Sequence, residues 1–296
     1  MKTLIDIEQC TGCGNCLKFC TKNILELTDK KTLNAKGVRY VKMSHEKKCI
    51  YCGICELMCT AGAIHIEGRK ENGYSLIDQK EIPPHAGCYL GTLTKVLCDI
   101  VCEMKIEDQI VIFKCKASDV NLHVETHDYM DNSYFFEGLK FKEEHPEKIV
   151  VLICSSSKIH STETNEERFR NLKKENVTII NTMNWFESDS AITKLTKGES
   201  HIIEELAERS DASFLARGNL QTPGDVDHLK KYLKQAIQNQ INGQSFSIVE
   251  FTFPCFYRLA NRPQVSMDYE EIEKIRTWYT NQVRPQYQEG IFRKQV

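Results

Sequence analysis

Two short blocks of cysteines constrain this chain more than any other feature of its sequence. Within each block four cysteines follow one another at the spacing C-x2-C-x2-C-x3-C, and the spacing of the two blocks is identical. The eight residues are Cys10, Cys13, Cys16, Cys20, Cys49, Cys52, Cys55 and Cys59. One such block alone is compatible with a zinc site or with chance, but two identical blocks indicate two iron–sulfur clusters. A chain that holds such clusters handles single electrons, and its other functions must connect to that role.

The cysteine spacing resembles the ligand run of bacterial two-cluster ferredoxins. In that family the fourth cysteine of each block binds the cluster of the other block, so the resemblance implies two [4Fe–4S] clusters with crossed ligands. The ligands implied for cluster I are Cys10, Cys13, Cys16 and Cys59, and those for cluster II are Cys49, Cys52, Cys55 and Cys20. The proline that usually follows the fourth cysteine is replaced by Thr21 and by Thr60. This change removes no ligand, but it bears on solvent access and on reduction potential.

The overall composition argues against several classes of function. The formal charge of -2 and the isoelectric point near 6.5 give no basic field for nucleic acid. The sequence has no run of about 18 apolar residues for a membrane span, and its first residues lack the apolar core of a signal peptide. Cluster cysteines need free thiolates and a reducing compartment. We therefore expect a cytoplasmic protein of an anaerobic or microaerophilic cell.

A polar, glycine-containing stretch at 68–81 indicates a linker, and beyond it helical and strand patterns alternate. The expected helices cover 90–104, 134–144 and 225–240, and the expected strands cover 109–113, 148–153, 176–180 and 245–251. Strands separated by helix-length segments predict an α/β fold with a parallel sheet covered on both faces. Ligands of such sheets bind at the carboxyl ends of the strands. The loops after these strands are therefore the places where a site is expected.

Several segments resemble the 2-oxoacid:ferredoxin oxidoreductases. The segment 33–40 is similar to the ferredoxin-like delta subunit of that family, and the likeness covers residues 1–67. The segment at about 82–292 resembles the beta subunit of that family, which is the subunit that binds thiamine diphosphate. The matching segments are His85-Ala86-Gly87-Cys88 before the first helix, Cys115 after a strand, 137–146, 212–218 and Val249-Glu250-Phe251-Thr252-Phe253-Pro254-Cys255. The resemblance implies a ferredoxin domain at 1–67, a linker at 68–81 and, at 82–296, a parallel-sheet domain like those that bind thiamine diphosphate.

The thiamine signature of that family departs from its usual form here. The family holds the Mg²⁺ of thiamine diphosphate with an acidic turn, where this chain has Cys154-Ser155-Ser156-Ser157. The family's asparagine survives as Asn184, whereas its basic segment is replaced by Tyr129-Met130-Asp131. Serine hydroxyls supply no charge, and an aspartate beside a diphosphate would repel it. Ser155, Ser157 and Asn184 therefore mark a degenerate site, and ordinary thiamine diphosphate and Mg²⁺ binding is not expected.

The family also has a third [4Fe–4S] cluster, for which this chain offers an incomplete set of cysteines. Cys88, Cys115 and Cys255 are available, with His85 where a fourth cysteine belongs. Either the histidine completes the set and raises the potential, or one iron stays open as a Lewis acid and carries the catalysis. His85 is also compatible with a plain surface turn. Cys154 is an alternative ligand to Cys115, although a core position is the expectation for Cys154.

The remaining candidate residues have simpler interpretations. Cys98 and Cys102 lie four residues apart on the expected helix 90–104, which indicates buried apolar thiols. Lys95, Arg217 and Arg258 are candidates for facing an anionic substrate, but lone basic residues are usually solvated. These interpretations leave the cluster cysteines as the main guide to function.

These observations favour the iron–sulfur subunit of a 2-oxoacid:ferredoxin oxidoreductase-like complex. The resemblance implies an alpha-type partner subunit and an external ferredoxin that exchanges electrons through three [4Fe–4S] clusters. Two alternatives stay open: a non-catalytic electron conduit on the same scaffold, and a thiamine-independent reductase that uses an open cluster iron. Neither the substrate nor the direction of electron flow follows from the sequence.

Overall fold

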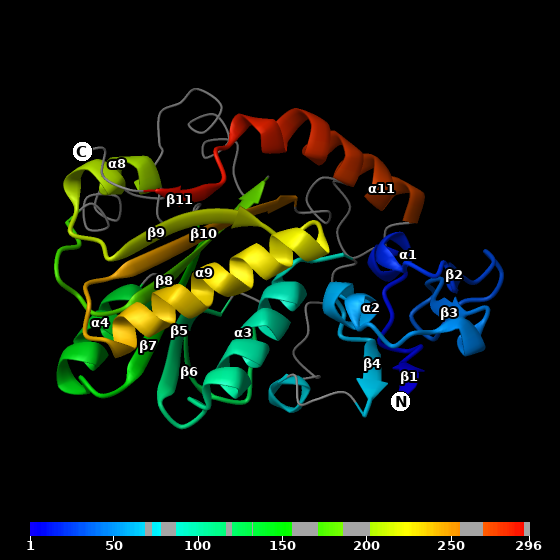
Figure 1. The fold of residues 1–296 in the computed structure, drawn as a ribbon, viewed down its shortest axis with the longest axis horizontal. Helices are drawn as coiled ribbons and strands as arrows, with labels where there is room; N and C mark the ends of the chain where they lie inside the picture. The colour runs from blue at the N-terminus through cyan, green and yellow to red at the C-terminus, as the bar shows by residue number, and fades with distance from the viewer. Residues whose placement is uncertain are drawn as a thin grey trace.

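The computed structural model describes residues 1–68, 73–77, 87–116, 120–131, 133–155, 171–185, 202–254 and 269–292. Over these residues a small module with the two cysteine blocks packs against the helices of a larger α/β domain (Figure 1). The architecture is the α/β fold expected from the sequence. None of the helices described is long and apolar enough to cross a membrane.

The N-terminal module repeats a unit of short elements. The strands are β1 (Lys2–Ile5), β2 (Leu25–Leu27), β3 (Val41–Met43) and β4 (Ile64–Glu67), and the helical elements are α1 (Asn15–Phe19), η1 (Glu46–Lys48) and α2 (Ile54–Met58). The strands pair antiparallel, β1 with β4 and β2 with β3. Gly14 and Gly53 precede α1 and α2 with φ values of 71° and 81°, which L-residues with a Cβ rarely adopt. The tight turns expected beside the clusters are thus confirmed at these glycines.

The large domain is built on a seven-stranded sheet in the order β11-β9-β10-β8-β7-β5-β6. Its strands are β5 (Ile110–Cys115), β6 (Glu125–Tyr129), β7 (Ile149–Ser155), β8 (Thr178–Trp185), β9 (Phe214–Asn219), β10 (Ser247–Pro254) and β11 (Gly290–Phe292). All neighbouring strands run parallel except β11, which pairs antiparallel with β9 at one edge. The parallel sheet predicted from alternating strands and helices is confirmed.

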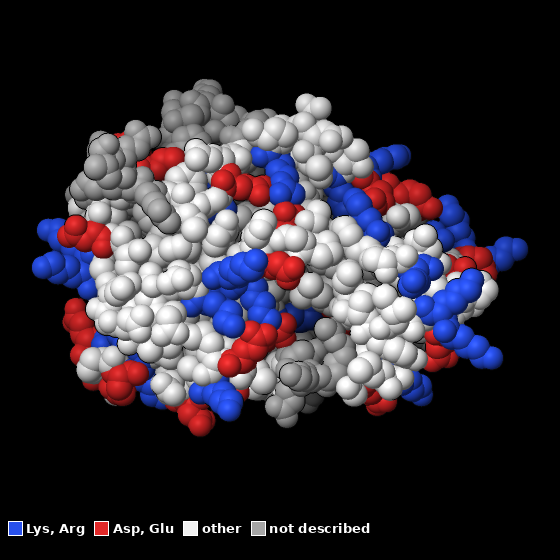
Figure 2. Space-filling model, in the orientation of Figure 1, with Lys and Arg blue, Asp and Glu red and all other residues white. Residues whose placement is uncertain are grey.

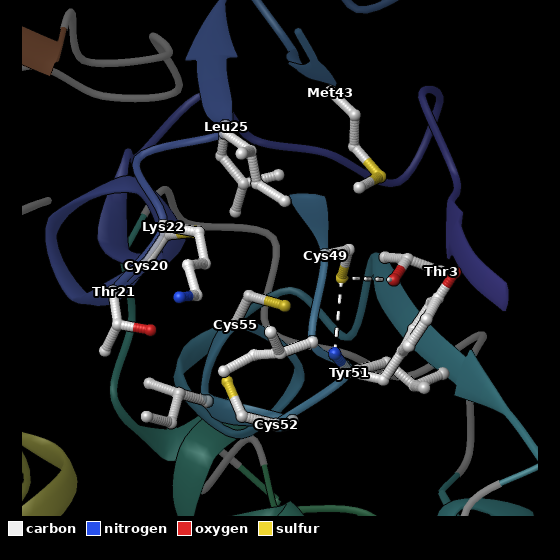
Figure 3. Close-up of a pocket in the computed structure, with 15 residues that line it drawn as sticks. Thr3, Cys20, Thr21, Lys22, Leu25, Met43, Cys49, Tyr51, Cys52 and Cys55 are labelled. Carbon is white, nitrogen blue, oxygen red and sulfur yellow. Dashed lines mark hydrogen bonds between the residues drawn. The ribbon is translucent and has the colours of Figure 1, made fainter. Parts of the chain in front are cut away.

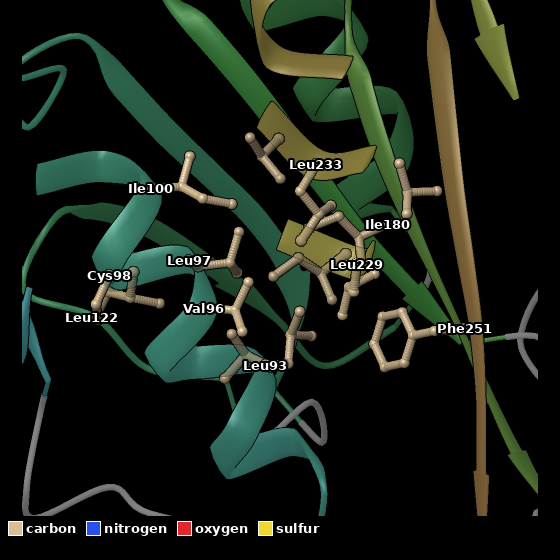
Figure 4. Packing of buried hydrophobic residues seen from close by; sticks show 14 of the residues in the cluster. Leu93, Val96, Leu97, Cys98, Ile100, Leu122, Ile180, Leu229, Leu233 and Phe251 are labelled. Atoms are coloured by element: carbon tan, nitrogen blue, oxygen red, sulfur yellow. The ribbon is translucent and has the colours of Figure 1, made fainter. Parts of the chain in front are cut away.

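Helices cover both faces of this sheet. They are α3 (Leu90–Met104), α4 (Tyr134–Glu144), α8 (Ile202–Arg209), α9 (Pro223–Ile241) and α11 (Tyr269–Trp278), with the short helical turns η2 (Tyr74–Leu76), η4 (Tyr279–Val283) and η5 (Arg284–Gln286). Side chains alternate along β5, so that Ile112 packs under α3 and α9 whereas Phe113 packs under α4. Figure 4 shows the first of these layers, in which Leu97 and Leu233 meet Ile180 of β8.

The predicted elements differ from the observed ones mainly at the strand ends. The helices expected at 90–104 and 134–144 have the observed bounds, and α9 begins two residues before the expected helix 225–240. The strands β7, β8 and β10 continue two to five residues beyond their expected ends. Ser155 and Asn184 therefore lie on strands, not in the loops that were expected to carry them.

Candidate iron–sulfur sites

The four cysteines assigned to cluster II line a single cavity (Figure 3). They are Cys20, which ends α1, and Cys49, Cys52 and Cys55 from the loop into α2. The rest of the lining is largely apolar and includes Leu25, Met43 and Ile66. Soft thiolates around an apolar cavity are the donor set that an iron–sulfur cluster takes. The residues therefore fit a cluster here, with the crossed fourth ligand that the ferredoxin resemblance implies.

The backbone around cluster II directs hydrogen-bond donors at one sulfur. The Tyr51 N–H donates to Cys49 Sγ at 3.4 Å, and the Thr3 hydroxyl lies 3.6 Å from the same sulfur. Tyr51 has a φ of 53°, an uncommon value for a residue with a side chain. Burial raises the pKa of the Cys55 thiol to about 12, and the thiols of Cys52, Cys20 and Cys49 add to the rise. Cluster assembly here must therefore displace thiol protons.

The four cysteines assigned to cluster I form a second set, and all of them are buried. Cys10, Cys16 and Cys59 belong to one core cluster with the surrounding strands. Burial raises the pKa of the Cys16 thiol well above its usual value, and the thiols of Cys59, Cys13 and Cys10 raise it further. Burial likewise raises the pKa of Cys10 to about 11, with smaller contributions from Cys59 and Cys13. These mutual effects mark the four thiols as near neighbours.

Hydrogen bonds also reach the sulfurs of cluster I. The Ala63 N–H donates to Cys59 Sγ at 3.1 Å. The Thr60 hydroxyl lies 3.8 Å from Cys13 Sγ, so the threonine that replaces the family's proline contacts a proposed ligand. Such contacts to ligand sulfurs are one means by which a protein sets cluster potential.

The two cysteine sets differ in their access to solvent. Cys52 of cluster II is exposed, and Cys20, Cys49 and Cys55 are half-buried. Every cysteine of cluster I is buried, and Cys13 belongs to the same core cluster as α3 and α9 of the large domain. Cluster I is thus buried against the core of the large domain, whereas Cys52 of cluster II opens to a solvent-accessible crevice that Lys95 and Lys230 also line.

Two side chains of the large domain reach the backbone of cluster I ligands. The Lys95 ammonium donates to the carbonyl oxygens of Glu56 and Leu57, at 2.6 and 2.8 Å, and to that of Cys59. Arg276 Nη2 donates to the Cys13 carbonyl oxygen at 3.2 Å. Burial lowers the pKa of Lys95, and the charges of Cys59 and Glu56 oppose this effect.

The expectation that lone basic residues are solvated is wrong for Lys95 and Arg217, because both are buried. Lys95 shares a face of the helix 90–104 with Gly91 and Asp99 and lies opposite Leu93 and Leu97, so the apolar periodicity gives no signal of its burial. Sequence reasoning missed Arg276, which lies in a largely polar stretch that gives no signal either. Arg258 lies outside the described residues.

The degenerate thiamine positions lie at the carboxyl ends of neighbouring strands. Ser155 ends β7 and is paired with Thr182 of β8, and Asn184 follows two residues further along β8. Ser157 lies outside the described residues. A hydroxyl and an amide supply no negative charge for a diphosphate-bound Mg²⁺. The positions described do not fit that group, and no chemical step is assigned to it.

The proposed ligands of the third cluster are only partly described. Cys88 is half-buried immediately before α3, which packs on one face of the sheet. Cys115 ends β5 and packs in the core cluster on the opposite face, beside Tyr134 and Phe135 of α4. Cys255 and His85 lie outside the described residues, so the third cluster stays a prediction.

The remaining cysteines behave largely as expected. Cys154 is buried in the core under α4, where burial raises its thiol pKa to about 12. Cys98 is buried on α3, and burial raises its thiol pKa as well. The core interpretation is confirmed for both, whereas Cys102 is only half-buried.

Comparison with solved structures finds a similar fold in a 2-oxoacid oxidoreductase. The 2-oxoglutarate:ferredoxin oxidoreductase of Magnetococcus marinus, solved with 2-oxoglutarate, coenzyme A and succinyl-CoA bound, aligns with 78% of this chain and 87% of its own chain, with a TM-score of 0.50. The sequence identity is 11%, so the likeness concerns the fold alone.

The N-terminal module has relatives at the level of sequence. Residues 9–71 match the family model of the 4Fe-4S dicluster domain. An uncharacterized ferredoxin of Methanocaldococcus jannaschii is 30% identical over 69 residues, which are 23% of this chain and 97% of that protein. Ferredoxin-3 of a Nostoc species is 31% identical over 67 residues, 19% of this chain and 66% of that protein. Through its N-terminal module, the chain belongs to the 4Fe-4S dicluster ferredoxin family.

Proposed function

We propose that this chain is the electron-transfer subunit of a 2-oxoacid:ferredoxin oxidoreductase-like complex. In this role cluster II exchanges electrons with an external one-electron carrier such as ferredoxin, and cluster I relays them to or from the large domain. The dicluster family match implies the two [4Fe–4S] clusters. The observation that carries the proposal is the difference in exposure, because cluster I faces the large domain while Cys52 of cluster II is exposed.

The protein's own part in this reaction is to hold and shield the clusters, which supply the one-electron chemistry. The eight thiolates bind the irons, and the donors at Cys49 and Cys59 stabilise negative charge on the sulfurs. Burial of cluster I excludes water from it, whereas the exposed Cys52 shortens the path to a docked carrier. No proton is needed for transfer between the two clusters.

The surface around cluster II suits an acidic carrier. Exposed Lys22 and Ile50 line the cavity, and the exposed residues Glu46, Lys47 and Lys48 directly precede the ligand Cys49. Figure 2 shows basic side chains over this outer end of the module, with a few carboxylates between them. Positive charge around an apolar contact favours the docking of a negatively charged partner. We therefore expect carrier reduction to slow as salt rises.

The proposed complex includes an alpha-type partner subunit, with the large domain as the scaffold that docks it.

The serine at position 155 favours the non-catalytic alternative, in which this chain conducts electrons and the chemistry belongs to another subunit. The alternative with an open cluster iron needs Cys88 and Cys115 at one cluster. The packing of Cys115 under α4 does not favour that arrangement.

Metal and cofactor content of the protein, purified without oxygen, tests the proposal. Two clusters correspond to about eight irons per chain, whereas a third cluster raises the figure to about twelve. We expect about eight irons from the dicluster module, or about twelve with the predicted third cluster, together with no bound thiamine and reduction of an acidic ferredoxin by the chemically reduced chain. Zinc in place of iron, or clusters that fail to reduce any carrier, would contradict an electron-transfer role.

A further inference from the structure

We infer that two buried cations of the large domain, Lys95 of α3 and Arg276 of α11, raise the reduction potential of cluster I above that of cluster II. An electron that enters at cluster II is then transferred to cluster I, beside the large domain, because cluster I is the more readily reduced of the two. The inference rests on the proposed electron-transfer function and gives it a direction. It assigns a tuning role to residues that bind no cluster themselves.

Lys95 brings a full positive charge to one ligand of cluster I. Its side chain is 7% exposed, and its three carbonyl acceptors, on Glu56, Leu57 and Cys59, match the three N–H donors of an ammonium group. A neutral amine has only two such donors, so three carbonyl acceptors favour the charged form. The charge therefore lies at the backbone of Cys59, the ligand that crosses into cluster I from the second block.

Arg276 brings a second charge to another ligand of the same cluster. It is 2% exposed, and its guanidinium donates to the carbonyl oxygen of Cys13 at 3.2 Å. Glu273 pairs with this guanidinium but lies partly in solvent, so it offsets the charge only in part. Near Lys95, the carboxylate of Asp99 pairs with Lys230. The buried carboxylate of Glu56 accepts from the Ile66 N–H and contacts the His65 ring, so it offsets one of the two cationic charges only in part. A net positive field therefore acts on cluster I.

No buried charge is among the described residues that line the cavity of cluster II, although Lys95 lines the neighbouring crevice together with Cys52. The one cation in that lining is Lys22, whose side chain is exposed and screened by water. A buried charge acts with far less screening, because the local dielectric constant is low. Since the reduced cluster carries one more negative charge than the oxidised cluster, nearby positive charge stabilises reduction. Cluster I should accordingly hold the electron more tightly.

The electron balance of this step is simple. One electron passes from reduced cluster II to oxidised cluster I, so cluster II is oxidised and cluster I is reduced by one electron. No bond forms or breaks, and no proton moves. The electron comes from the one-electron carrier that docks at cluster II.

The experiment is a redox titration of the full chain, followed by electron paramagnetic resonance without oxygen. In the Lys95→Met variant we expect the potential of cluster I to fall by at least 59 mV, a tenfold loss of electron affinity for a one-electron couple, and the potential of cluster II to fall by less. Lys95→Arg should restore most of the difference. Lys234→Met is the matched control, because Lys234 is partly exposed and pairs with Glu103, a carboxylate that Lys230 also pairs. It should leave both potentials unchanged.

A second variant separates the effect of positive charge on the potential of cluster I from the effect of the hydrogen bonds that Lys95 makes to the end of α2. Arg276→Gln keeps a donor near the Cys13 carbonyl but removes the charge, and it should lower the potential of cluster I alone. If Lys95→Met does not assemble its clusters, Arg276→Gln decides the question. Normal potentials in an assembled Lys95→Met chain, or in Arg276→Gln, would overturn the inference. A chain without any [4Fe–4S] signal would instead refute the proposed function.

Discussion

Thr60 shows how one side chain can adjust a cluster without binding it. Its buried hydroxyl lies 3.8 Å from Cys13 Sγ, where the ferredoxin pattern has a proline that offers no donor. Thr60→Val keeps the shape of the side chain and removes this contact. We expect the potential of cluster I to fall by less than about 59 mV, a tenfold change in electron affinity, and redox titration measures it. The control is Thr21→Val at the equivalent, exposed position of the first block, and an equal shift there would contradict a specific role for the Thr60 hydroxyl.

Arg217 belongs to a buried ionic network that serves stability. Its Nε donates to Glu250 Oε1 at 2.5 Å, and its two terminal nitrogens bind both oxygens of Glu204. Asn181 donates to the second oxygen of Glu250 at 2.6 Å. Arg217→Met leaves the Glu250 carboxylate buried without its cation, so the free energy of unfolding should fall by roughly 3–5 kcal/mol. Denaturant unfolding measures the loss. Glu204→Gln should cost about 1 kcal/mol or less, because that side chain is partly in solvent.

At the scale of elements, the first turn of α3 sets how closely the two parts of the chain approach. A Cβ at Gly91 would lie 1.8 Å from the Thr60 carbonyl oxygen, so only glycine permits the observed packing. Gly91→Ala must therefore move α3 away from the end of α2 and weaken the contacts of Lys95. We expect a lower melting temperature, measured by circular dichroism, and a changed spectrum of cluster I. Gly224→Ala on α9 is the control, since its Cβ would meet only the Thr222 hydroxyl oxygen at 3.8 Å. An equal loss of melting temperature in Gly224→Ala would show that the substitution destabilises the helix itself and not the contact between α3 and α2.

The elements that sequence patterns predicted are those that bury a continuous apolar face. The helix 90–104 and the strands β5 and β7 fall in this group. The edge strand β6 was not predicted, because Glu125-Thr126-His127-Asp128-Tyr129 has no apolar run and stays half-exposed. The helix α11 was not predicted either, since among its residues only Ile272 and Arg276 are buried. Its partner is the N-terminal module, and no local pattern shows a contact between segments so far apart.

At the scale of the whole molecule, the candidate site was predicted only in part. The spacing of the eight cysteines and the family crossing predicted two sets of four, and the cavity lined by Cys20 and Cys55 agrees with one of them. The position of cluster I against the large domain could not be predicted. It depends on long-range packing, in which Cys13 and Met58 join the core of α3 and α9. The asymmetry between the clusters is therefore a property of the assembled chain and not of the repeated motif.

This shared core predicts that the two clusters contribute differently to the stability of the whole chain. Cys52→Ser replaces an exposed ligand of cluster II, so the loss of stability should be confined to the N-terminal module. Cys13→Ser replaces a buried ligand of cluster I that packs with residues such as Leu93 of α3. Each variant should lose up to about four irons, but only Cys13→Ser should lower the melting temperature of the large domain. Iron analysis and thermal circular dichroism test this together. Equal melting temperatures in two variants with equal iron loss would mean that cluster I does not support the interface, because a ligand shared with the core must couple metal binding to folding.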